Sequence, residues 1–190
     1  MIRIAVVGDI GSGKTYIAKL FGFPVFNADK NVAEIYKKNR LVYKKLKTKL
    51  PEYIITFPVK KSHISNAIRN NPRNIKLVSK IIHPVVRKRM REFLRKNSSK
   101  KAVVLDIPLY FENNLNRNKD IVIFVSSRKK LINRALKKRN KSNLRLLKKL
   151  SKLQLPLEKK KKKSDYVIKN NFNKADIKKK VNVVKRQIFL

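Results

Sequence analysis

Hydrophobic and polar positions follow two patterns along the chain. Five short runs contain consecutive apolar residues, mostly Val, Ile and Phe, which is typical of strands buried on both faces of a parallel sheet. These runs are residues 2–7, 23–29, 100–108, 120–127 and 164–171. Between most of them, apolar residues recur every three or four positions, which is the spacing of amphipathic helices. This order predicts an α/β fold with a doubly wound, five-stranded parallel sheet.

The predicted helices are unevenly distributed, because a large block of them lies between the second and third strands. We expect helices over residues 31–50, 60–70 and 72–96, with a proline-bounded connector at 51–58, and further along the chain over 128–140, 141–154 and 174–190. Pro84 should kink or split the third of these helices, because its ring removes a backbone N–H and clashes with the preceding turn.

The length of 190 residues gives room for one sizeable hydrophobic core. We therefore expect a single domain over 1–190, with a core formed by residues 1–30 and 97–190. The helical block at about 31–96 is an insertion into that core. A basic helical segment at about 140–155, after the fourth strand, has the position of a lid.

The charge of the chain is strongly unbalanced. Fifty-one Lys and Arg residues against eleven Asp and Glu residues give a formal net charge of +40. Such a surface attracts polyanions and binds nucleic acid non-specifically at low salt. The sequence has no aromatic-interleaved basic repeat, zinc motif or recognition-helix pattern. We interpret the charge mainly as compositional bias on a solvated surface, with polyanion binding as the alternative primary role.

Two classes of protein are disfavoured by simple absences. The chain has no cysteine, which excludes disulfides and thiolate metal sites. No apolar run approaches the roughly 18 residues that a membrane span needs. The N-terminal segment also lacks a signal-peptide cleavage site. We therefore expect a cytoplasmic protein without a membrane role.

The stretch "GDIGSGKT", residues 8–15, holds three of the four glycines of the chain. It matches the pattern G-x-x-x-x-G-K-[ST], and it lies between a predicted strand and a helical segment, the context that this pattern requires. Backbone N–H groups of such a loop hold a phosphate chain, and glycines let the main chain curl around it. Lys14 then reaches the β- and γ-phosphates, and the Thr15 hydroxyl is a magnesium ligand. A glycine turn that only joined strand to helix would predict neither residue.

The loop therefore predicts binding of a nucleoside triphosphate by a P-loop, nucleoside-kinase-like fold. The expected nucleotide contacts within it are Gly8, Gly11, Ser12, Gly13, Lys14, Thr15 and Tyr16. Asp9 is electrostatically unfavourable there, so its side chain should point away from the anion. The absence of a guanine-reading N-K-x-D motif disfavours a GTPase, and the chain is short for a motor ATPase. A small-molecule kinase fits the length, the inserted block and the basic segment.

Several segments resemble the dephospho-CoA kinase family in order and spacing. They are "GDIGSGKT", "PVFNAD" where the family has a strand ending in D-A-D, "IIHPVVR", "VVLDIPLYFENNL" and "QLPLEKKKKKSDYVIKNN", which together span residues 1 to about 172. The resemblance implies phosphoryl transfer from ATP, with Mg²⁺, to the ribose 3′-hydroxyl of dephospho-CoA, the last step of coenzyme A synthesis. It also implies that the inserted block binds the acceptor. Another small-molecule kinase, such as a nucleoside monophosphate kinase, and a degenerate P-loop protein that binds polyanions are the alternatives.

The resemblance implies roles for individual acidic residues. Asp29, which matches the second acid of D-A-D, is the expected general base for the acceptor hydroxyl, with capping of the next helix as the alternative. Asn27 stands where the family has the first acid and can contribute only hydrogen bonds. Asp106 ends the third strand, as a Walker B carboxylate does, and would hold magnesium through water; capping a turn before Pro108 is the alternative.

Basic residues after the fourth strand are expected to neutralise charge on the transferred phosphoryl group. The resemblance favours Arg134 for this role and Arg139 as a nucleotide contact, with a solvated helix face as the alternative. Of the five consecutive lysines at 159–163, we expect most to be solvated and one or two to touch phosphate. Asn170, after the fifth strand, is expected to shape the adenine pocket.

Two further residues have two interpretations each. Glu112, in "LYFEN", either borders the acceptor site or has a surface or capping role. His83 precedes Pro84 in an apolar helix, which favours a packed residue, and the H-P signature of the family is the functional alternative. His63 has no partner motif, so the two histidines do not predict a metal site.

Overall fold

The computed structural model describes residues 1–139 and 154–190. The chain divides into two compact units, one formed by Met1–Asn27 with Asn97–Leu190 and the other by Ala28–Lys96. Much of the segment expected to form a lid, residues 140–153, and most of the predicted helix at 141–154 lie outside the described residues. Among the described residues, no helix is long and apolar enough to cross a membrane.

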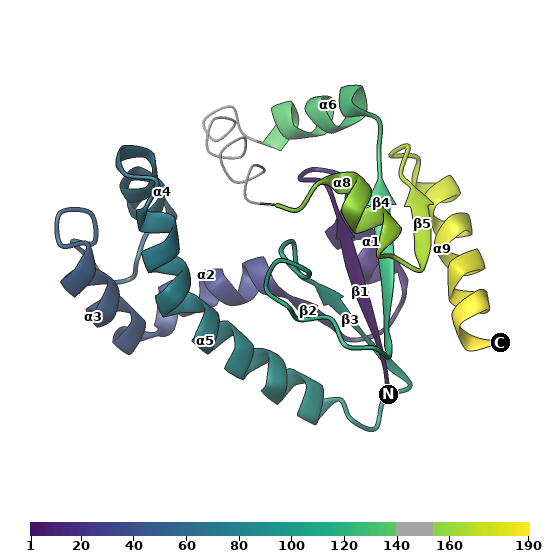
Figure 1. Cartoon of the computed structure of the whole chain (residues 1–190), viewed down its shortest axis with the longest axis horizontal. Coiled ribbons are helices and arrows are strands. Elements are labelled where there is room, and N and C mark those ends of the chain that lie inside the picture. Colours follow the sequence, from purple (N-terminus) through teal and green to yellow (C-terminus); the bar gives the residue numbers. More distant parts are fainter. Residues whose placement is uncertain (140–153) are drawn as a thin grey trace. The chain divides into compact units, whose positions relative to one another are not determined.

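The first unit is built on a parallel five-stranded sheet (Figure 1). Its strands are β1 (Ile2–Gly8), β2 (Val25–Asn27), β3 (Ala102–Asp106), β4 (Asp120–Ser126) and β5 (Tyr166–Lys169). They lie in the order β2-β3-β1-β4-β5, and every neighbouring pair is parallel. The predicted α/β class and the predicted five-stranded parallel sheet are therefore confirmed.

Helices and a loop segment cover the two faces of this sheet. On one face, α1 (Lys14–Leu20) and α9 (Lys174–Phe189) pack over the strands and on each other. The largest buried residues of this layer are Ile4, Ile17, Phe21, Ile123, Ile168 and Ile177. On the other face, α8 (Leu157–Lys162) contacts β1. The remaining helix of this unit, α6 (Lys129–Arg139), follows β4.

The strand register brings the carboxyl ends of four strands to one edge of the sheet. Val6 and Asn27 both lie opposite Asp106, and Gly8 lies opposite Val125. In open α/β sheets, ligands bind outside this edge, at the point where the strand order reverses. The residues that end β1, β2 and β3 are therefore placed where a ligand site is expected.

The second unit is helical, as expected for the inserted block. It contains α2 (Ala28–Lys38), α3 (Arg40–Lys49), α4 (Lys61–Asn70) and α5 (Asn74–Lys96). The first three helices pack on the long α5. Apolar residues at helical spacing form its interior, and the most buried of them are Ile35, Val42, Leu46, Ile54, Ala67, Val78 and Ile82.

The structure bears out one local expectation about this unit, refines a second and corrects a third. Residues 31–50 are helical, as expected, and they form two helices because the side chain of Asn39 accepts a hydrogen bond from the Val42 backbone N–H (2.9 Å) and starts a new helix. The helix α5 runs through Pro84 as one element, so it is not split, and a kink at Pro84 stays a prediction. The second strand ends at Asn27, so Asp29 lies in the first turn of α2 rather than at the end of a strand.

Candidate active site

The glycine-rich loop joins the last residue of β1 to the first turn of α1. Gly8, Gly11 and Gly13 have φ values of 141°, 82° and 91°, a region that side chains disfavour. A Cβ atom at Gly8 would lie 2.3 Å from the carbonyl oxygen of Val125, and one at Gly13 would lie 2.2 Å from Nδ2 of Asn170. Glycine is therefore required at both positions by conformation and by space.

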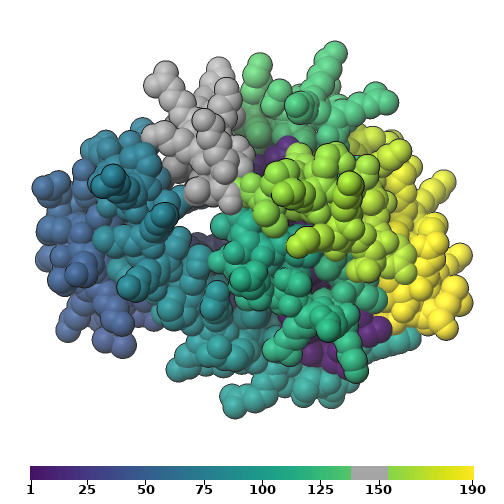
Figure 2. Space-filling model, viewed as in Figure 1, coloured from purple at the N-terminus to yellow at the C-terminus, as the bar shows by residue number. Residues whose placement is uncertain are grey.

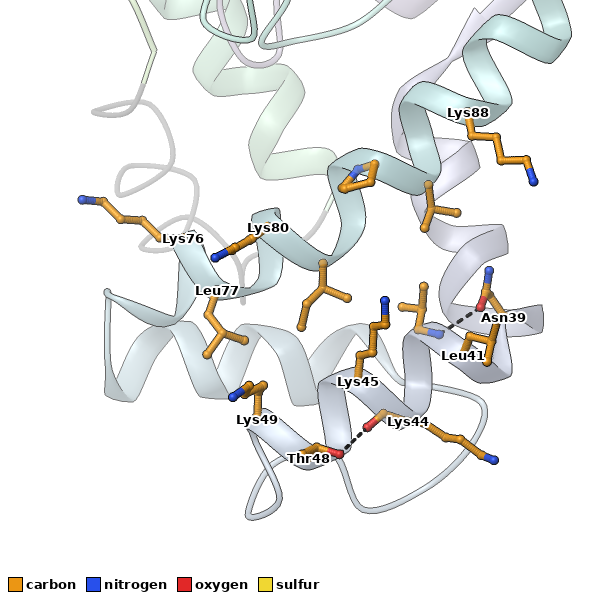
Figure 3. Close-up of a pocket in the computed structure, with 14 residues that line it drawn as sticks. Asn39, Leu41, Lys44, Lys45, Thr48, Lys49, Lys76, Leu77, Lys80 and Lys88 are labelled. Atoms are coloured by element: carbon orange, nitrogen blue, oxygen red, sulfur yellow. Dashed lines mark hydrogen bonds between the residues drawn. The ribbon is translucent and has the colours of Figure 1, made fainter.

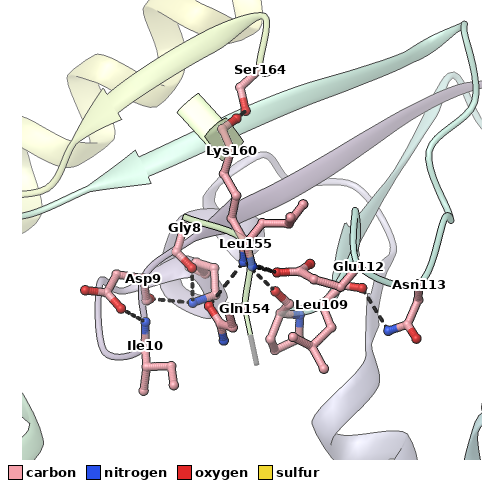
Figure 4. Close-up of polar contacts among 12 residues, drawn as sticks. Gly8, Asp9, Ile10, Leu109, Glu112, Asn113, Gln154, Leu155, Lys160 and Ser164 are labelled. Atoms are coloured by element: carbon pink, nitrogen blue, oxygen red, sulfur yellow. Dashed lines mark hydrogen bonds and ion pairs between the residues drawn. The ribbon is translucent and has the colours of Figure 1, made fainter. Parts of the chain in front are cut away.

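The Lys14 side chain lies over this loop. Its Nζ donates hydrogen bonds to the carbonyl oxygens of Gly8 (3.2 Å) and Asp9 (2.6 Å), and the residue is buried. The Asp9 carboxylate accepts a hydrogen bond from the backbone N–H of Ile10 (2.7 Å), so it is held by the loop's own backbone (Figure 4). Lys14 thus brings a positive charge to a loop of curled backbone.

Three polar side chains meet where β2, β3 and α1 come together. The Thr15 hydroxyl donates a hydrogen bond to Oδ2 of Asp106 (2.6 Å), and the amide of Asn27 donates to the same oxygen. Asp106 is only 3% exposed. This contact explains how an amide is accommodated at position 27: it donates to Asp106, where a second carboxylate would repel it.

The oxygen atoms of Thr15 and Asp106 fit a magnesium ion. Mg²⁺ is a hard cation that binds one or two protein oxygens and completes its shell with phosphate oxygens and water. The paired hydroxyl and carboxylate supply that donor set. Among the described residues, there is no group of three or more His, Cys, Asp and Glu side chains, as a metal held entirely by the protein would need.

Ser12, Tyr16 and Asn170 are also predicted to contact the nucleotide, and they differ from one another in burial and hydrogen bonding. Ser12 is fully buried, and its hydroxyl has no hydrogen-bond partner. Tyr16 is 38% exposed on α1. The Asn170 amide donates to the carbonyl of Ser12 (2.7 Å) and accepts from the backbone N–H of Phe172 (2.7 Å). Asn170 therefore ties the chain after β5 to the glycine-rich loop, and a contact of its amide with adenine stays a prediction.

The helix α6 packs on the glycine-rich loop through its apolar face. Side-chain atoms of Ile132 and Leu136 lie 3.0–3.1 Å from where a Cβ atom of Gly11 would be. Arg134 lies midway between these two residues, about 200° around the helix axis from Ile132, and it is exposed. The long side chains of α6 project from the surface in Figure 2. The structure thus does not bring Arg134 to the loop, and the Arg139 side chain lies outside the described part of the chain.

Comparison with known proteins identifies the family. A model of the dephospho-CoA kinase family matches residues 2–176. The chain belongs to the dephospho-CoA kinase family. A dephospho-CoA kinase of Agrobacterium fabrum is 35% identical over 131 residues, which cover 66% of this chain and 66% of that protein. One from Zymomonas mobilis is 32% identical over 130 residues, covering 67% and 66%. The matched segment thus spans just under two thirds of these relatives.

Solved structures agree with this membership. A dephospho-CoA kinase from Campylobacter jejuni is 26% identical, with a TM-score of 0.64, and the similarity covers 98% of this chain and 96% of that one. The protein TT1252 from Thermus thermophilus has the same fold, with a TM-score of 0.80 at 24% identity over 98% of this chain and 97% of that one. A shikimate kinase from Acinetobacter baumannii shares the fold at a TM-score of 0.53 and 16% identity, over 100% of this chain and 93% of that one.

Asp29, the predicted general base, lies at the start of α2. Asp29 follows Asn27 by two residues and lies in the first turn of α2, where a carboxylate interacts favourably with the helix dipole. Capping of the helix by Asp29 was the alternative to catalysis. Asp29 is not the N-cap residue, because the helix begins one residue earlier, at Ala28.

The helical unit carries a groove between α3 and α5. It has a volume of about 1070 Å³ and an aliphatic lining that includes Val42, Leu77 and Ile81. Six lysines surround it, and no acidic residue lines it; they are Lys44, Lys45, Lys49, Lys76, Lys80 and Lys88. Figure 3 shows these side chains along both helices, on either side of the aliphatic lining. Such a groove suits a ligand with both aliphatic and anionic parts.

One buried ion pair was not anticipated from the sequence. Lys160, within the run of five lysines, forms a salt bridge with Glu112 (2.8 Å) beside the glycine-rich loop (Figure 4). The lysine run forms most of α8, a helix that the sequence analysis did not predict. The burial of Lys160 could not be predicted, because the sequence does not distinguish five consecutive lysines. The packing of α8 on β1 distinguishes them.

His83 is half-buried on α5, one turn before Arg87. Burial, and then repulsion by the charged Arg87, lower its pKa below the ordinary value of 6.5. The folded protein therefore binds this proton more weakly than the unfolded chain does. Its contribution to stability is complete above the ordinary pKa and is lost as the pH falls through the lowered one.

We expect the free energy of unfolding to fall as the pH is lowered from about 6.5, and His83→Phe to flatten this part of the profile. Urea unfolding of both proteins between about pH 5 and pH 8 measures it. Parallel profiles for the two proteins would contradict the assignment to His83.

Proposed function

We propose that this protein is a dephospho-CoA kinase, which transfers the γ-phosphoryl group of ATP to the ribose 3′-hydroxyl of dephospho-CoA. The observation that carries the proposal is the glycine-rich loop with Lys14 and the Thr15–Asp106 pair, in a chain that matches the family over residues 2–176. The names of the relatives support the choice of acceptor. The reaction is assigned to the cytoplasm, and the charge of +40 is assigned only non-specific contact with nucleic acid.

In the proposed reaction, the glycine-rich loop compensates the negative charge of the triphosphate. Backbone N–H groups of residues 8–15 cradle the phosphate chain, and Gly8, Gly11 and Gly13 leave it room. The Lys14 ammonium leaves its carbonyl partners for the β- and γ-phosphates. Thr15 and Asp106 would hold Mg²⁺, which would supply positive charge to offset that of the phosphates.

Asp29 is the general base of the proposed reaction. It accepts the proton of the 3′-hydroxyl as that oxygen forms its bond to the γ-phosphorus. The bond from the γ-phosphorus to the bridging oxygen breaks, and that oxygen leaves with its electron pair as part of ADP. An arginine after β4 compensates the charge on the transferred group. Arg134 stays the candidate from the family resemblance, and Arg139 is the alternative because it follows Ile132 by seven residues, about two helical turns.

The helical unit binds the acceptor. Dephospho-CoA has an aliphatic arm and a diphosphate, and the groove between α3 and α5 offers an aliphatic lining and ammonium groups that complement both. Lys45 on α3 and Lys80 on α5 stand on opposite sides of this lining (Figure 3).

The acceptor proposal predicts the effect of reversing charges at this groove. We expect Lys45→Glu with Lys80→Glu to raise the KM for dephospho-CoA by about tenfold or more, because two attractions to a diphosphate become repulsions. The KM for ATP should change by less than about twofold. Lys60→Glu with Lys61→Glu is the matched control, since these lysines belong to the same unit and do not line the groove. Equal effects in both pairs would assign the result to overall charge.

The magnesium proposal predicts the effect of neutralising Asp106. We expect Asp106→Asn to weaken Mg²⁺-dependent ATP binding by about tenfold or more, because the remaining amide oxygen carries no full charge. Calorimetric titration of ATP at several Mg²⁺ concentrations measures this without turnover. Asp176→Asn, which removes an exposed carboxylate paired with Lys180, is the control. An unchanged Mg²⁺ dependence would exclude Asp106 as the ligand.

The proposed function is tested by an ATP-consumption assay with dephospho-CoA, adenosine, AMP and pantetheine as acceptors. Dephospho-CoA as the single productive acceptor is the expected result. Turnover only with AMP would establish a nucleoside monophosphate kinase. Absence of turnover together with tight binding of DNA at physiological salt would establish the polyanion-binding alternative.

A further inference from the structure

Lys160 differs from every other lysine in its run. Its side chain is 0% exposed, whereas Lys159, Lys161, Lys162 and Lys163 are all exposed. Burying an ammonium group is unfavourable unless charged or polar partners replace the water that it loses. The buried ammonium group of Lys160 therefore needs compensating partners, whereas the exposed neighbouring lysines do not.

Lys160 has partners from two segments, one close to it in the sequence (Gln154) and one about 50 residues earlier (Pro108 and Glu112). Its Nζ lies 2.8 Å from Oε1 of Glu112, 3.1 Å from Oε1 of Gln154 and 3.3 Å from the carbonyl oxygen of Pro108. An ammonium group has three hydrogens. The three acceptors use all of them, so Lys160 in this arrangement has no donor left for a phosphate.

Glu112 is the second buried charge of this cluster. Its Oε1 also accepts the backbone N–H of Leu155 (2.8 Å), whereas its Oε2 is buried without a hydrogen-bond partner. Lys160 is thus the single cation that forms an ion pair with this carboxylate in the described part of the chain. The helix α8, which carries Lys160, contacts β1, the strand that ends at Gly8, and Figure 4 draws the pair together with Gly8 and Asp9.

We propose that Lys160 is a positioning residue for phosphoryl transfer. It cancels the charge of Glu112 beside the loop that must receive a triphosphate, and it fixes the segment from Pro108 to Glu112, which follows Asp106 directly. Without Lys160, the buried carboxylate of Glu112 is uncompensated, and its charge repels ATP bound to this loop. The inference rests on one part of the proposed function, the binding of ATP to this loop, and does not depend on the acceptor.

The proposal predicts opposite effects for the two members of the pair. Lys160→Met keeps the aliphatic stem and removes the charge, and we expect it to raise the Kd for ATP about tenfold. Glu112→Gln keeps the shape and should leave the Kd unchanged or lower. The double variant should recover ATP binding to within about twofold of the unaltered protein. A purely structural role would not give this rescue, because the double variant still lacks the salt bridge.

The neighbouring lysines supply matched controls. Lys159→Met and Lys161→Met each remove one positive charge from the same helix at an exposed position, and we expect the Kd for ATP to change by less than about twofold. Lys160→Arg, which keeps the charge, should stay closer to the unaltered protein than Lys160→Met does.

Binding is measured by calorimetric titration of ATP with Mg²⁺ on the full chain, without any acceptor. The test therefore stands even if dephospho-CoA proves not to be the acceptor. The proposal is overturned if Lys160→Met binds ATP normally, if the exposed controls weaken binding equally, or if the double variant shows no recovery. Should Lys160→Met fail to fold, Glu112→Gln decides the matter: weaker ATP binding by this variant contradicts the proposal, and equal or tighter binding supports it.

Discussion

Lys14→Ala is expected to abolish ATP-dependent phosphoryl transfer. The ammonium group of Lys14 is the charged side chain that the glycine-rich loop offers to the β- and γ-phosphates, and it already lies over the loop through contacts of 2.6 and 3.2 Å with backbone carbonyls. Its loss removes charge compensation from the ground state and still more from the transition state. Turnover by the purified variant, in the assay with dephospho-CoA, measures the effect.

The fold of the variant must be shown to be intact. Lys14 is buried, so Lys14→Met serves as a second variant that keeps the packed aliphatic stem. Lys19→Ala, on the exposed side of the same helix, is the control and should retain normal turnover. Near-normal turnover by a folded Lys14→Met protein would disprove the kinase assignment.

The glycine-rich loop could be predicted from the sequence because its chemistry is local. Gly8, Gly13 and Lys14 are required by backbone geometry and phosphate charge within eight consecutive residues. The order of strands and helices followed from hydrophobic periodicity, which is also a local property. The pairing of Thr15 with Asp106 joins residues far apart in the sequence, and it was predictable because the loop after β1 and the end of β3 meet at the carboxyl edge of a parallel sheet.

The features that sequence reasoning missed depend on long-range packing. Lys160 is buried because α8 packs on β1, and no property of five identical lysines indicates which one faces inward. Arg134, which resemblance favoured, is exposed because the apolar face of α6 covers Gly11, and its contact with the transferred group stays a prediction. Pro84 was expected to kink or split its helix, and α5, on which three other helices pack, is not split.

Asn27 shows how a departure from the family pattern is accommodated. Its amide donates a hydrogen bond to Asp106, the carboxylate that we assign to magnesium. An amide has no useful basicity, so Asn27 contributes orientation and no proton transfer. Asp29, two residues further along the chain, is therefore the acceptor that we propose for the hydroxyl proton.

Asp29→Asn is therefore expected to lower kcat by about 10² to 10⁴, the usual cost of losing a positioned general base. The amide keeps the size of the side chain and can still orient the hydroxyl by a hydrogen bond, so the loss reports on proton acceptance. The Kd for ATP should change by less than about twofold, because the glycine-rich loop and Lys14 hold the nucleotide. Steady-state kinetics with dephospho-CoA and a separate ATP titration distinguish the two quantities.

Glu34→Gln is the matched control for this experiment. Glu34 lies on the same helix, α2, and its exposed carboxylate forms an ion pair with Lys38 (3.3 Å). Removing that carboxylate changes the net charge by the same amount, and kcat should stay within about twofold because exposed pairs contribute little. If Asp29→Asn retains most of its kcat, the base lies elsewhere. Asp106→Asn would then have to be tested for a loss of kcat that added Mg²⁺ does not restore.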